Sequence, residues 1–207
     1  MIYAENIFIC IVVPLLVSLF FIKDKVRHFV IFLFLGMTMC LLSAYISAFF
    51  GSLEGASAED TSVFISPVIE EIMKFFPVAF LLLVFDPDDE LITLSAIAIG
   101  IGFATFENCC YILSDSAASL PYMLVRGFSV GVMHIVCTVM VGYGLVFLRK
   151  VGTMGISAVV GLLAFASTFH ALYNLLVSET GISEYIALAM PLAAAIGLKT
   201  FIKRERN

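Results

Sequence analysis

The sequence predicts an all-α integral membrane protein, a polytopic bundle of about seven transmembrane helices. Three observations predict it. Of the 207 residues, 62% are hydrophobic and only 13% are charged, whereas soluble domains are nearer half apolar and a quarter charged. The mean hydropathy is +1.11. Several apolar runs are also long enough to cross a hydrocarbon core of about 30 Å. We therefore expect the lipid bilayer as solvent, and no charged tail indicates nucleic acid as a partner.

Seven apolar runs follow one another along the chain, separated by short polar linkers. Each is close to the roughly 20 residues that one span needs. The first run carries Glu5 and follows no basic segment, so we expect a retained span and not a cleaved signal peptide. We predict one transmembrane helical domain over 1–207, with a catalytic core at about 62–177. The runs are 5–22, 29–50, 62–85, 91–113, 122–148, 155–177 and 185–202.

Basic residues predict the orientation, because linkers rich in Lys and Arg stay in the cytoplasm. They follow the first, fifth and seventh runs, which all end on one side if there are seven crossings. The opposite linkers, 51–61, 114–121 and 178–184, contain no Lys or Arg. We therefore expect the N-terminus outside, the C-terminus in the cytoplasm, and His28 solvated in a basic linker. The basic residues are Lys23, Lys25, Arg27, Arg149, Lys150, Lys203, Arg204 and Arg206.

Small residues predict close helix packing in the fourth run. Ala96 with Gly100, and Ala98 with Gly102, are small-xxx-small pairs that let two helix backbones approach. The five cysteines lie in apolar runs and form no CxxC motif, so we expect packing residues and predict no disulfide framework. They are Cys10, Cys40, Cys109, Cys110 and Cys137.

Ionisable and amide side chains interrupt four of the apolar runs. One ionised residue at the centre of a transmembrane helix costs about 2.5–3.5 kcal/mol. A membrane protein keeps such groups where they face one another or a wet cavity, so we predict that these side chains converge. They are Glu70, Glu71 and Lys74 in the third run, Glu107 and Asn108 in the fourth, Arg126 and His134 in the fifth, and His170 and Asn174 in the sixth.

Spacing and depth support this convergence. Glu70 and Lys74 share one helix face, as do His170 and Asn174. At 1.5 Å per residue, the polar groups lie about 9 to 18 Å below the expected outer helix ends, although the four helices alternate in direction. This depth corresponds to the outer half of the membrane. Pro67, one turn before Glu70, removes a backbone hydrogen bond and predicts a bend there.

Carboxylate and imidazole groups together can activate water, and His or Asn donors can stabilise an oxyanion. We therefore favour an intramembrane endopeptidase. A proton- or ion-coupled transporter also buries acids and histidines, but the sequence shows no convincing internal repeat. A non-catalytic scaffold is the third alternative. Within the site, an ion pair between helices is the alternative for the Glu70 cluster, interhelical bonding for Asn108, and headgroup contact for Arg126.

Four short motifs in consecutive runs resemble the PrsW family of intramembrane proteases, which is related to the CAAX-processing and bacteriocin-processing membrane proteases. The resemblance implies a bacterial or archaeal cell membrane and a membrane-anchored protein substrate. The resemblance also implies the family's role, which is site-1 cleavage of an anti-sigma factor. The motifs are EExxK (Glu70, Glu71, Lys74), GFATFEN (102–108), Arg126 to His134 followed by Thr138 and Gly142, and FHALYN (169–174).

The resemblance also implies roles for the residues. Glu70 and Glu71 become the catalytic pair, one of them the general base, with Lys74 neutralising either. Glu107 stands where the CAAX-processing relatives have a histidine, as a base partner or metal ligand. His134 and His170 would bind water, a metal or the oxyanion. Asn174 would donate to the oxyanion or orient His170, with Asn108 and Arg126 in support.

The cofactor stays open between two versions. A glutamic-type mechanism needs no metal, whereas a metal-dependent one uses a divalent ion such as zinc. Carboxylate and imidazole are acceptable zinc ligands. The metal-dependent version would draw its ligands from Glu70, Glu107, His134 and His170.

Overall fold

A computed structural model of the chain describes residues 4–114, 120–153, 155–179 and 181–206. These residues form helices joined by short connections and contain no strand, which confirms the all-α prediction. In order, the elements are α1 (Ala4–Ser18), α2 (Asp24–Glu54), α3 (Ala58–Asp60), the π-helical turn η1 (Thr61–Ile65), α4 (Ser66–Phe85), α5 (Asp89–Ser114), α6 (Leu120–Lys150), α7 (Ile156–Ser178) and α8 (Ile182–Arg206).

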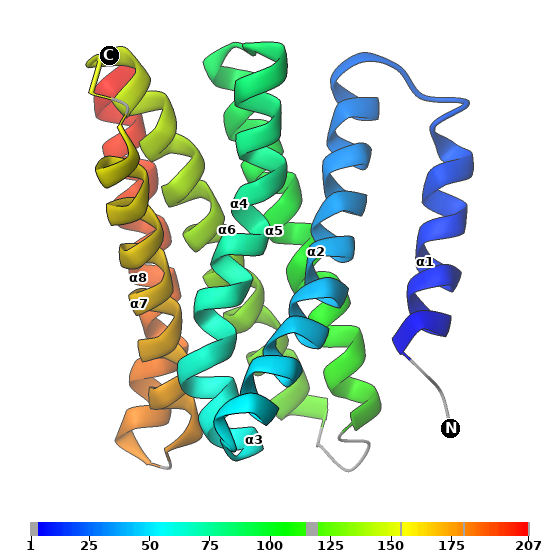
Figure 1. The fold of residues 1–207 in the computed structure, drawn as a ribbon, viewed down its shortest axis with the longest axis vertical. Helices are drawn as coiled ribbons and strands as arrows, with labels where there is room; N and C mark the ends of the chain where they lie inside the picture. Colours follow the sequence, from blue (N-terminus) through cyan, green and yellow to red (C-terminus); the bar gives the residue numbers. More distant parts are fainter. Residues whose placement is uncertain (1–3, 115–119, 154, 180, 207) are drawn as a thin grey trace.

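The long helices lie side by side and alternate in direction (Figure 1). α1 begins near one end of the bundle and α8 ends at the other. α5 packs against both α2 and α6, and α7 packs between α4 and α8. The core between them is apolar and includes Phe32, Val78, Ile99, Met133 and Leu145. α1 covers the outside of α2, where Val12 packs into a second small apolar cluster.

Within the described residues, five helices are long and apolar enough to cross a membrane: α2, α5, α6, α7 and α8. The chain is therefore a multi-pass membrane protein. Two of the seven predicted spans, α1 and α4, are not among these five helices, each for a physical reason. α4 has 20 residues but carries Glu70, Glu71 and Lys74. α1 has only 15 residues, and so extends about 22 Å, which is shorter than a hydrocarbon core of about 30 Å.

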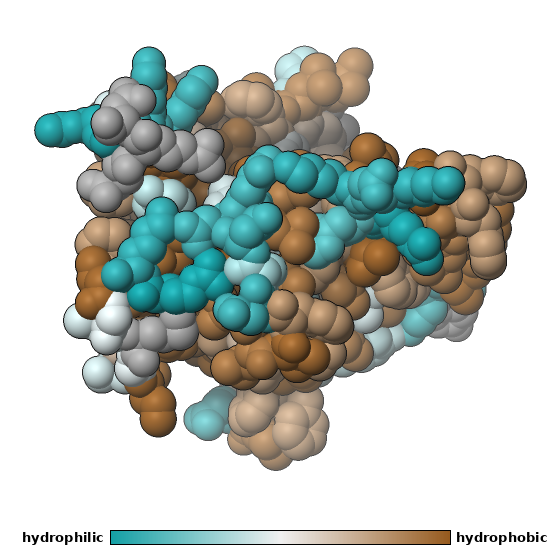
Figure 2. All heavy atoms as spheres, turned by 90° about the horizontal axis from the view of Figure 1, so that it is seen from above, coloured by the Kyte–Doolittle hydropathy of each residue, from teal (hydrophilic) through white to brown (hydrophobic). Residues whose placement is uncertain are grey.

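Polar contacts gather at the end of the bundle where α8 ends. Lys25 Nζ lies 2.7 Å from Glu90 Oε1, and Lys150 Nζ lies 3.0 Å from Asp89 Oδ2. Arg149 Nη1 donates to the Pro87 carbonyl at 2.8 Å. Figure 2 shows hydrophilic side chains spread across this end face. The first, third and fifth linkers are therefore on one side, as alternating crossings require.

His28 is half-buried between two helices and does not lie in a solvated linker, so that expectation was wrong. α2 begins at Asp24, five residues before the predicted span, and this places His28 inside the helix on the face toward α5. The ring stacks on Phe32 with centroids 4.5 Å apart. Its Nε2 lies 2.7 Å from Ser95 Oγ. The histidine therefore joins two helices, because the polar linker starts the helix instead of preceding it.

The predicted close approach of α5 to its neighbours is confirmed. A Cβ atom added at Gly100 would lie 2.8 Å from the Ile135 Cα atom of α6. One added at Gly102 would overlap the Leu33 carbonyl oxygen of α2. Backbone contact on both faces makes α5 the central helix, and this fixes where its polar residues point. The five cysteines are free, with Cys40 and Cys137 buried.

Candidate active site

Polar side chains of α4, α5, α6 and α7 meet inside the bundle. Glu71 and Lys74 are each 1% exposed, His134 is 0% and His170 is 2%. Glu70 and Glu107 are half-buried beside them. Ionised groups are found at such depth only when they pair with one another. The four helices therefore supply one connected cluster, which lies nearer the end of the bundle where α4 and α6 begin and α5 and α7 end (Figure 1).

Lys74 is the central cation of this cluster. Its Nζ donates to Glu71 Oε1 at 2.6 Å and lies 3.0 Å from His134 Nδ1. The ammonium group also sits 4.8 Å from the centroid of the Phe103 ring, a cation–π distance. Sequence left open which glutamate Lys74 would neutralise. In the structure it is Glu71, one turn before it on the same helix.

His170 is oriented by Glu71. Its Nδ1 lies 2.8 Å from Glu71 Oε1, so Nδ1 carries the proton and donates it to the carboxylate. The lone pair of Nε2 is left facing Glu70, with Nε2 3.8 Å from Oε2. A carboxylate that holds one ring nitrogen while the other points into a site is the usual second-shell arrangement of a metal-binding histidine.

His134 is held on both sides. The Lys74 ammonium can only donate, so Nδ1 of His134 accepts and Nε2 carries the proton. That proton is donated to Glu107 Oε2. The Phe103 ring packs on the imidazole with centroids 4.8 Å apart. This tautomer follows from the hydrogen-bond network, and binding a metal would require His134 to exchange one of its two partners.

The centre of the cluster has the donor set of a metal site. One ligand atom each from Glu70, His134 and His170 lie within 4.8 Å of one another. Glu70 Oε2 and Glu71 Oε2 are buried and accept no hydrogen bond, and such atoms are costly to bury. One carboxylate and two imidazoles suit zinc, and the open acceptors fit a cation or water. Glu107 lies outside this group of three and contacts His134.

Asn108 and Arg126 join α5 to α6 beside the cluster. Arg126 Nη1 donates to Asn108 Oδ1 at 3.1 Å, and Asn108 Nδ2 donates to the Gly127 carbonyl at 3.3 Å. The Arg126 guanidinium lies 3.4 Å from the centroid of the Tyr111 ring. The arginine therefore contacts protein groups, in a pocket of about 270 Å³ that Glu107 also lines.

Asn174 contacts the backbone of η1 instead of His170. Its Nδ2 donates to the Ser62 carbonyl at 3.0 Å. Among the described residues no hydrogen bond joins it to His170, although the two share a helix face. η1 needs such a partner because a π-helical turn disturbs the regular backbone ladder. Asn174 thus ties α7 to the segment that precedes α4.

A pocket of about 540 Å³ on the other side of the cluster is lined by Glu70 and by α2, a helix that we did not predict to take part. The available signal was a stripe of small residues on one face of α2: Ala44, Ser47, Ala48 and Gly51. Such stripes are also common in plain helix packing, so the sequence alone did not identify it. We call this cavity the α2 pocket.

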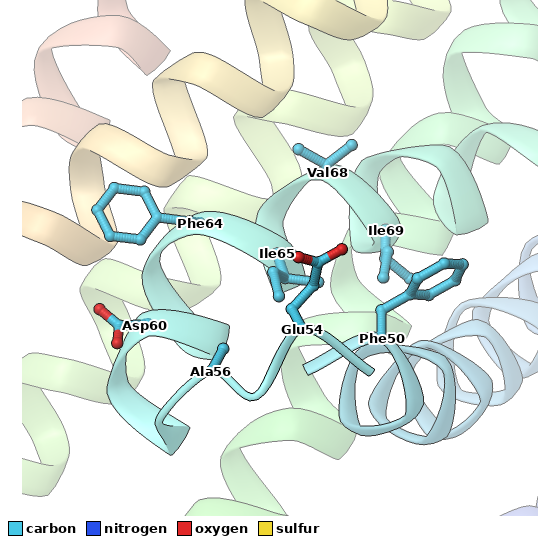
Figure 3. Close-up of a pocket in the computed structure, with 8 residues that line it drawn as sticks. All are labelled: Phe50, Glu54, Ala56, Asp60, Phe64, Ile65, Val68 and Ile69. Carbon is cyan, nitrogen blue, oxygen red and sulfur yellow. The ribbon is translucent and has the colours of Figure 1, made fainter. Parts of the chain in front are cut away.

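A third pocket, of about 650 Å³, does not reach the cluster. Figure 3 shows its wall of Phe50, Phe64, Ile65, Val68 and Ile69, with the Glu54 and Asp60 carboxylates nearby. None of the buried acids or histidines lines it. The candidate active site is therefore the cluster between the α2 pocket and the pocket at Glu107. Ser62 lines both of these pockets.

A family model described as "PrsW family intramembrane metalloprotease" matches residues 25–196. The matched range contains every predicted site residue and leaves out α1. No curated protein and no solved structure matches the chain.

Removing the central cation should destabilise the protein. Lys74→Met leaves the buried Glu71 carboxylate without its cation, which costs about 3–5 kcal/mol for a broken buried ion pair. We expect a lower midpoint of thermal unfolding in detergent. The matched control is the double variant Glu71→Gln with Lys74→Met, which removes both charges and should recover part of the loss. Equal losses in the single and double variants would contradict the pairing.

Proposed function

The chain belongs to the PrsW family of intramembrane metalloproteases, and from this we propose that it cuts a membrane-tethered protein near the outer leaflet. A membrane-anchored anti-sigma factor, cut at site 1 in a bacterial or archaeal cell membrane, is the substrate that the resemblance implies. The observation that carries the proposal is the buried cluster of acids and imidazoles, with its two open carboxylate oxygens, between two pockets.

In the metal-dependent version, Glu70, His134 and His170 would hold a divalent metal such as zinc. That ion, when bound, supplies an activated water and polarises the scissile carbonyl group. The grouping of the three ligand atoms supports this version, as does the family's description as metalloproteases. The metal-free alternative uses Glu70 as general base, since its unpartnered Oε2 can accept a proton from water.

The other residues of the cluster have positioning roles in this proposal. Glu71 holds the proton on Nδ1 of His170 and so keeps Nε2 available. Lys74 compensates the charge of Glu71 in a site that bulk water does not screen. Glu107 borders a pocket beside His134, where it can accept a proton from water and return it to the leaving amine. Asn174 anchors η1 over the site.

For topology we propose seven crossings within one domain over 1–207, with the N-terminus outside and the C-terminus in the cytoplasm. The α4 helix crosses despite its charges, because Lys74 and Glu71 pair inside the protein. The α1 helix is continued by hydrogen-bonded turns over 19–22, so the segment 4–22 extends about 28 Å, close to the thickness of the hydrocarbon core. The catalytic core at about 62–177 then spans η1 to α7. The polar cluster lies nearer the end of the bundle opposite the basic linkers, which supports cleavage on the outer side.

The topology can be tested by cysteine labelling of intact cells with a membrane-impermeant maleimide. In a cysteine-free background, Leu53→Cys and Ile182→Cys should be labelled from outside. Val151→Cys and Phe20→Cys, at the other end of the bundle, should be labelled only after the membrane is opened. All four side chains are more than a third exposed. Labelling of Val151→Cys in intact cells would contradict the orientation.

Replacing the acids tests the chemistry. Glu70→Gln should lower the cleavage rate of a single-span peptide in liposomes by about 10²- to 10⁴-fold, the usual range for a lost acid–base group. Glu71→Gln should lower it by about 10- to 100-fold, the usual range for a lost partner of a site histidine. The matched control is Glu90→Gln, which alters a surface ion pair with Lys25 at the other end of the bundle and should cleave normally. Full cleavage by both site variants would exclude a role for these acids.

Metal analysis separates the two mechanisms. We expect purified wild type to contain a stoichiometric divalent metal and to lose both metal and cleavage with a strong chelator. His170→Ala should lack the metal even before chelation, because it removes one of three ligands. Elemental analysis of protein purified without added metal is the readout. Metal-free protein that still cleaves would favour the glutamic-type mechanism.

A further inference from the structure

The α2 pocket contains a feature that the proposed chemistry does not use, a buried hydroxyl group without a partner. Ser47 is 4% exposed and lines the pocket together with Glu70. Its Oγ makes no hydrogen bond. A buried hydroxyl group without a partner destabilises a protein. Inside a membrane bulk water does not supply the missing partner, so a hydroxyl group at this position requires a functional explanation.

Other hydroxyl groups of α2 satisfy themselves within the helix. Thr38 Oγ1 donates to the Phe34 carbonyl at 3.0 Å, Ser43 Oγ to Cys40 at 2.8 Å and Ser52 Oγ to Phe49 at 2.8 Å. This back-bonding is the ordinary state of Ser and Thr in helices. Ser47 lies one turn after Ser43 and, unlike Ser43, lines the α2 pocket. Of these four hydroxyl groups, that of Ser47 is the one without a hydrogen-bond partner.

The shape of the α2 pocket is set by close contact between α2 and η1. A Cβ atom at Gly51 would overlap the Thr61 hydroxyl, so the segment is seated directly on α2 at this point. Thr61 Oγ1 itself donates to the Ser57 carbonyl at 2.8 Å. The cavity of about 540 Å³ lies in the usual range for a ligand site, about 300–1,000 Å³.

We propose that the α2 pocket binds the peptide chain of the substrate next to the bond that is cut, and that the Ser47 hydroxyl hydrogen-bonds its backbone. This inference rests on the proposed protease function and adds the place where the substrate binds. An extended peptide exposes N–H and C=O groups that must be paired inside a membrane. A lipid acyl chain has no such groups, and it would fit the apolar wall shown in Figure 3 better.

Several features of the pocket match a peptide chain. Ser47, Ser62 and Ser66 supply hydroxyl groups at its wall, and Ala44 and Ala48 leave room for a backbone to approach α2. Glu70 also lines it, which brings a bound peptide to the reacting centre. A serine hydroxyl can both donate and accept, so it can pair with either backbone group.

Substitution of Ser47 gives a test that separates a binding role from a structural one. The probe is a synthetic peptide with one apolar span and a fluorophore–quencher pair in its outer juxtamembrane segment, in vesicles of phosphatidylethanolamine and phosphatidylglycerol. Ser47→Ala should raise KM about 3- to 10-fold with little change in kcat, the size of one lost hydrogen bond. Ser47→Thr keeps the hydroxyl and should restore KM.

Stability gives the second readout. Ser47→Ala removes an unpaired polar atom and should unfold at the same temperature as wild type or higher. Its matched control is Ser43→Ala, which removes a satisfied hydroxyl on the same helix and should leave KM unchanged. An unchanged KM in Ser47→Ala, in a preparation that cleaves the peptide, would overturn the inference and leave the protease function standing.

Photo-cross-linking decides the case even if the peptide is not cleaved. A benzoylphenylalanine at Ala48, in the pocket wall, should cross-link to the peptide, whereas one at Leu42, which is 42% exposed and not part of the pocket, should not. The Glu70→Gln variant should cross-link like wild type, since it retains the pocket. Equal or absent cross-linking at both positions would overturn the binding site. Cross-linking only at Ala48 without cleavage would refute the protease function alone.

Discussion

The structure depends on one constraint: a lysine ammonium buried in an apolar helix bundle must find its counter-charge and its hydrogen-bond acceptors inside the protein. Lys74 meets this requirement with the Glu71 carboxylate at 2.6 Å and the His134 imidazole at 3.0 Å. The contact with Glu71 lies within α4, and the contact with His134 joins α4 to α6. Glu71 in turn accepts a hydrogen bond from His170 on α7. The register of α4 against α6 and α7 is thus fixed by these hydrogen bonds, because a slip would separate the Lys74–Glu71 pair from the His134 and His170 imidazoles in a low-dielectric interior.

The packing of α5 complements this constraint. Gly100 and Gly102 bring its backbone against α6 and α2, and the Phe103 ring packs against both Lys74 and His134. Glu107 follows one turn later on the same face and accepts the proton of His134. Small residues therefore set the distance between the helices, and the aromatic ring excludes water from one side of the polar cluster. Two carboxylate oxygens stay open on the other side, where the chemistry is proposed.

One wall of the site is formed by η1, whose backbone hydrogen bonds differ from those of a regular α-helix. η1 is a π-helical turn directly before Pro67, and Asn174 holds its Ser62 carbonyl. Pro67, where the sequence predicts a bend, stands in the first turn of α4, a position at which a missing N–H is tolerated, and follows the change from π-helix to α-helix. Because η1 lies against α2 and lines the pockets on both sides of the cluster, a π-helical turn borders the candidate site.

The sequence by itself determined the helical fold, the order of the helices and the residues that meet, because the free energy of burying charge in lipid allows few arrangements for Glu70, Glu71, Lys74 and His170. Spacing on each helix settled which of them share a face. Tertiary structure alone decided which partner each group takes: Lys74 pairs with Glu71, Asn174 with the backbone of η1, and His28 with α5. It also brought α2 and Ser47 to the site. These outcomes depend on angstrom-scale distances between helices, and a one-dimensional pattern of residue types does not contain those distances.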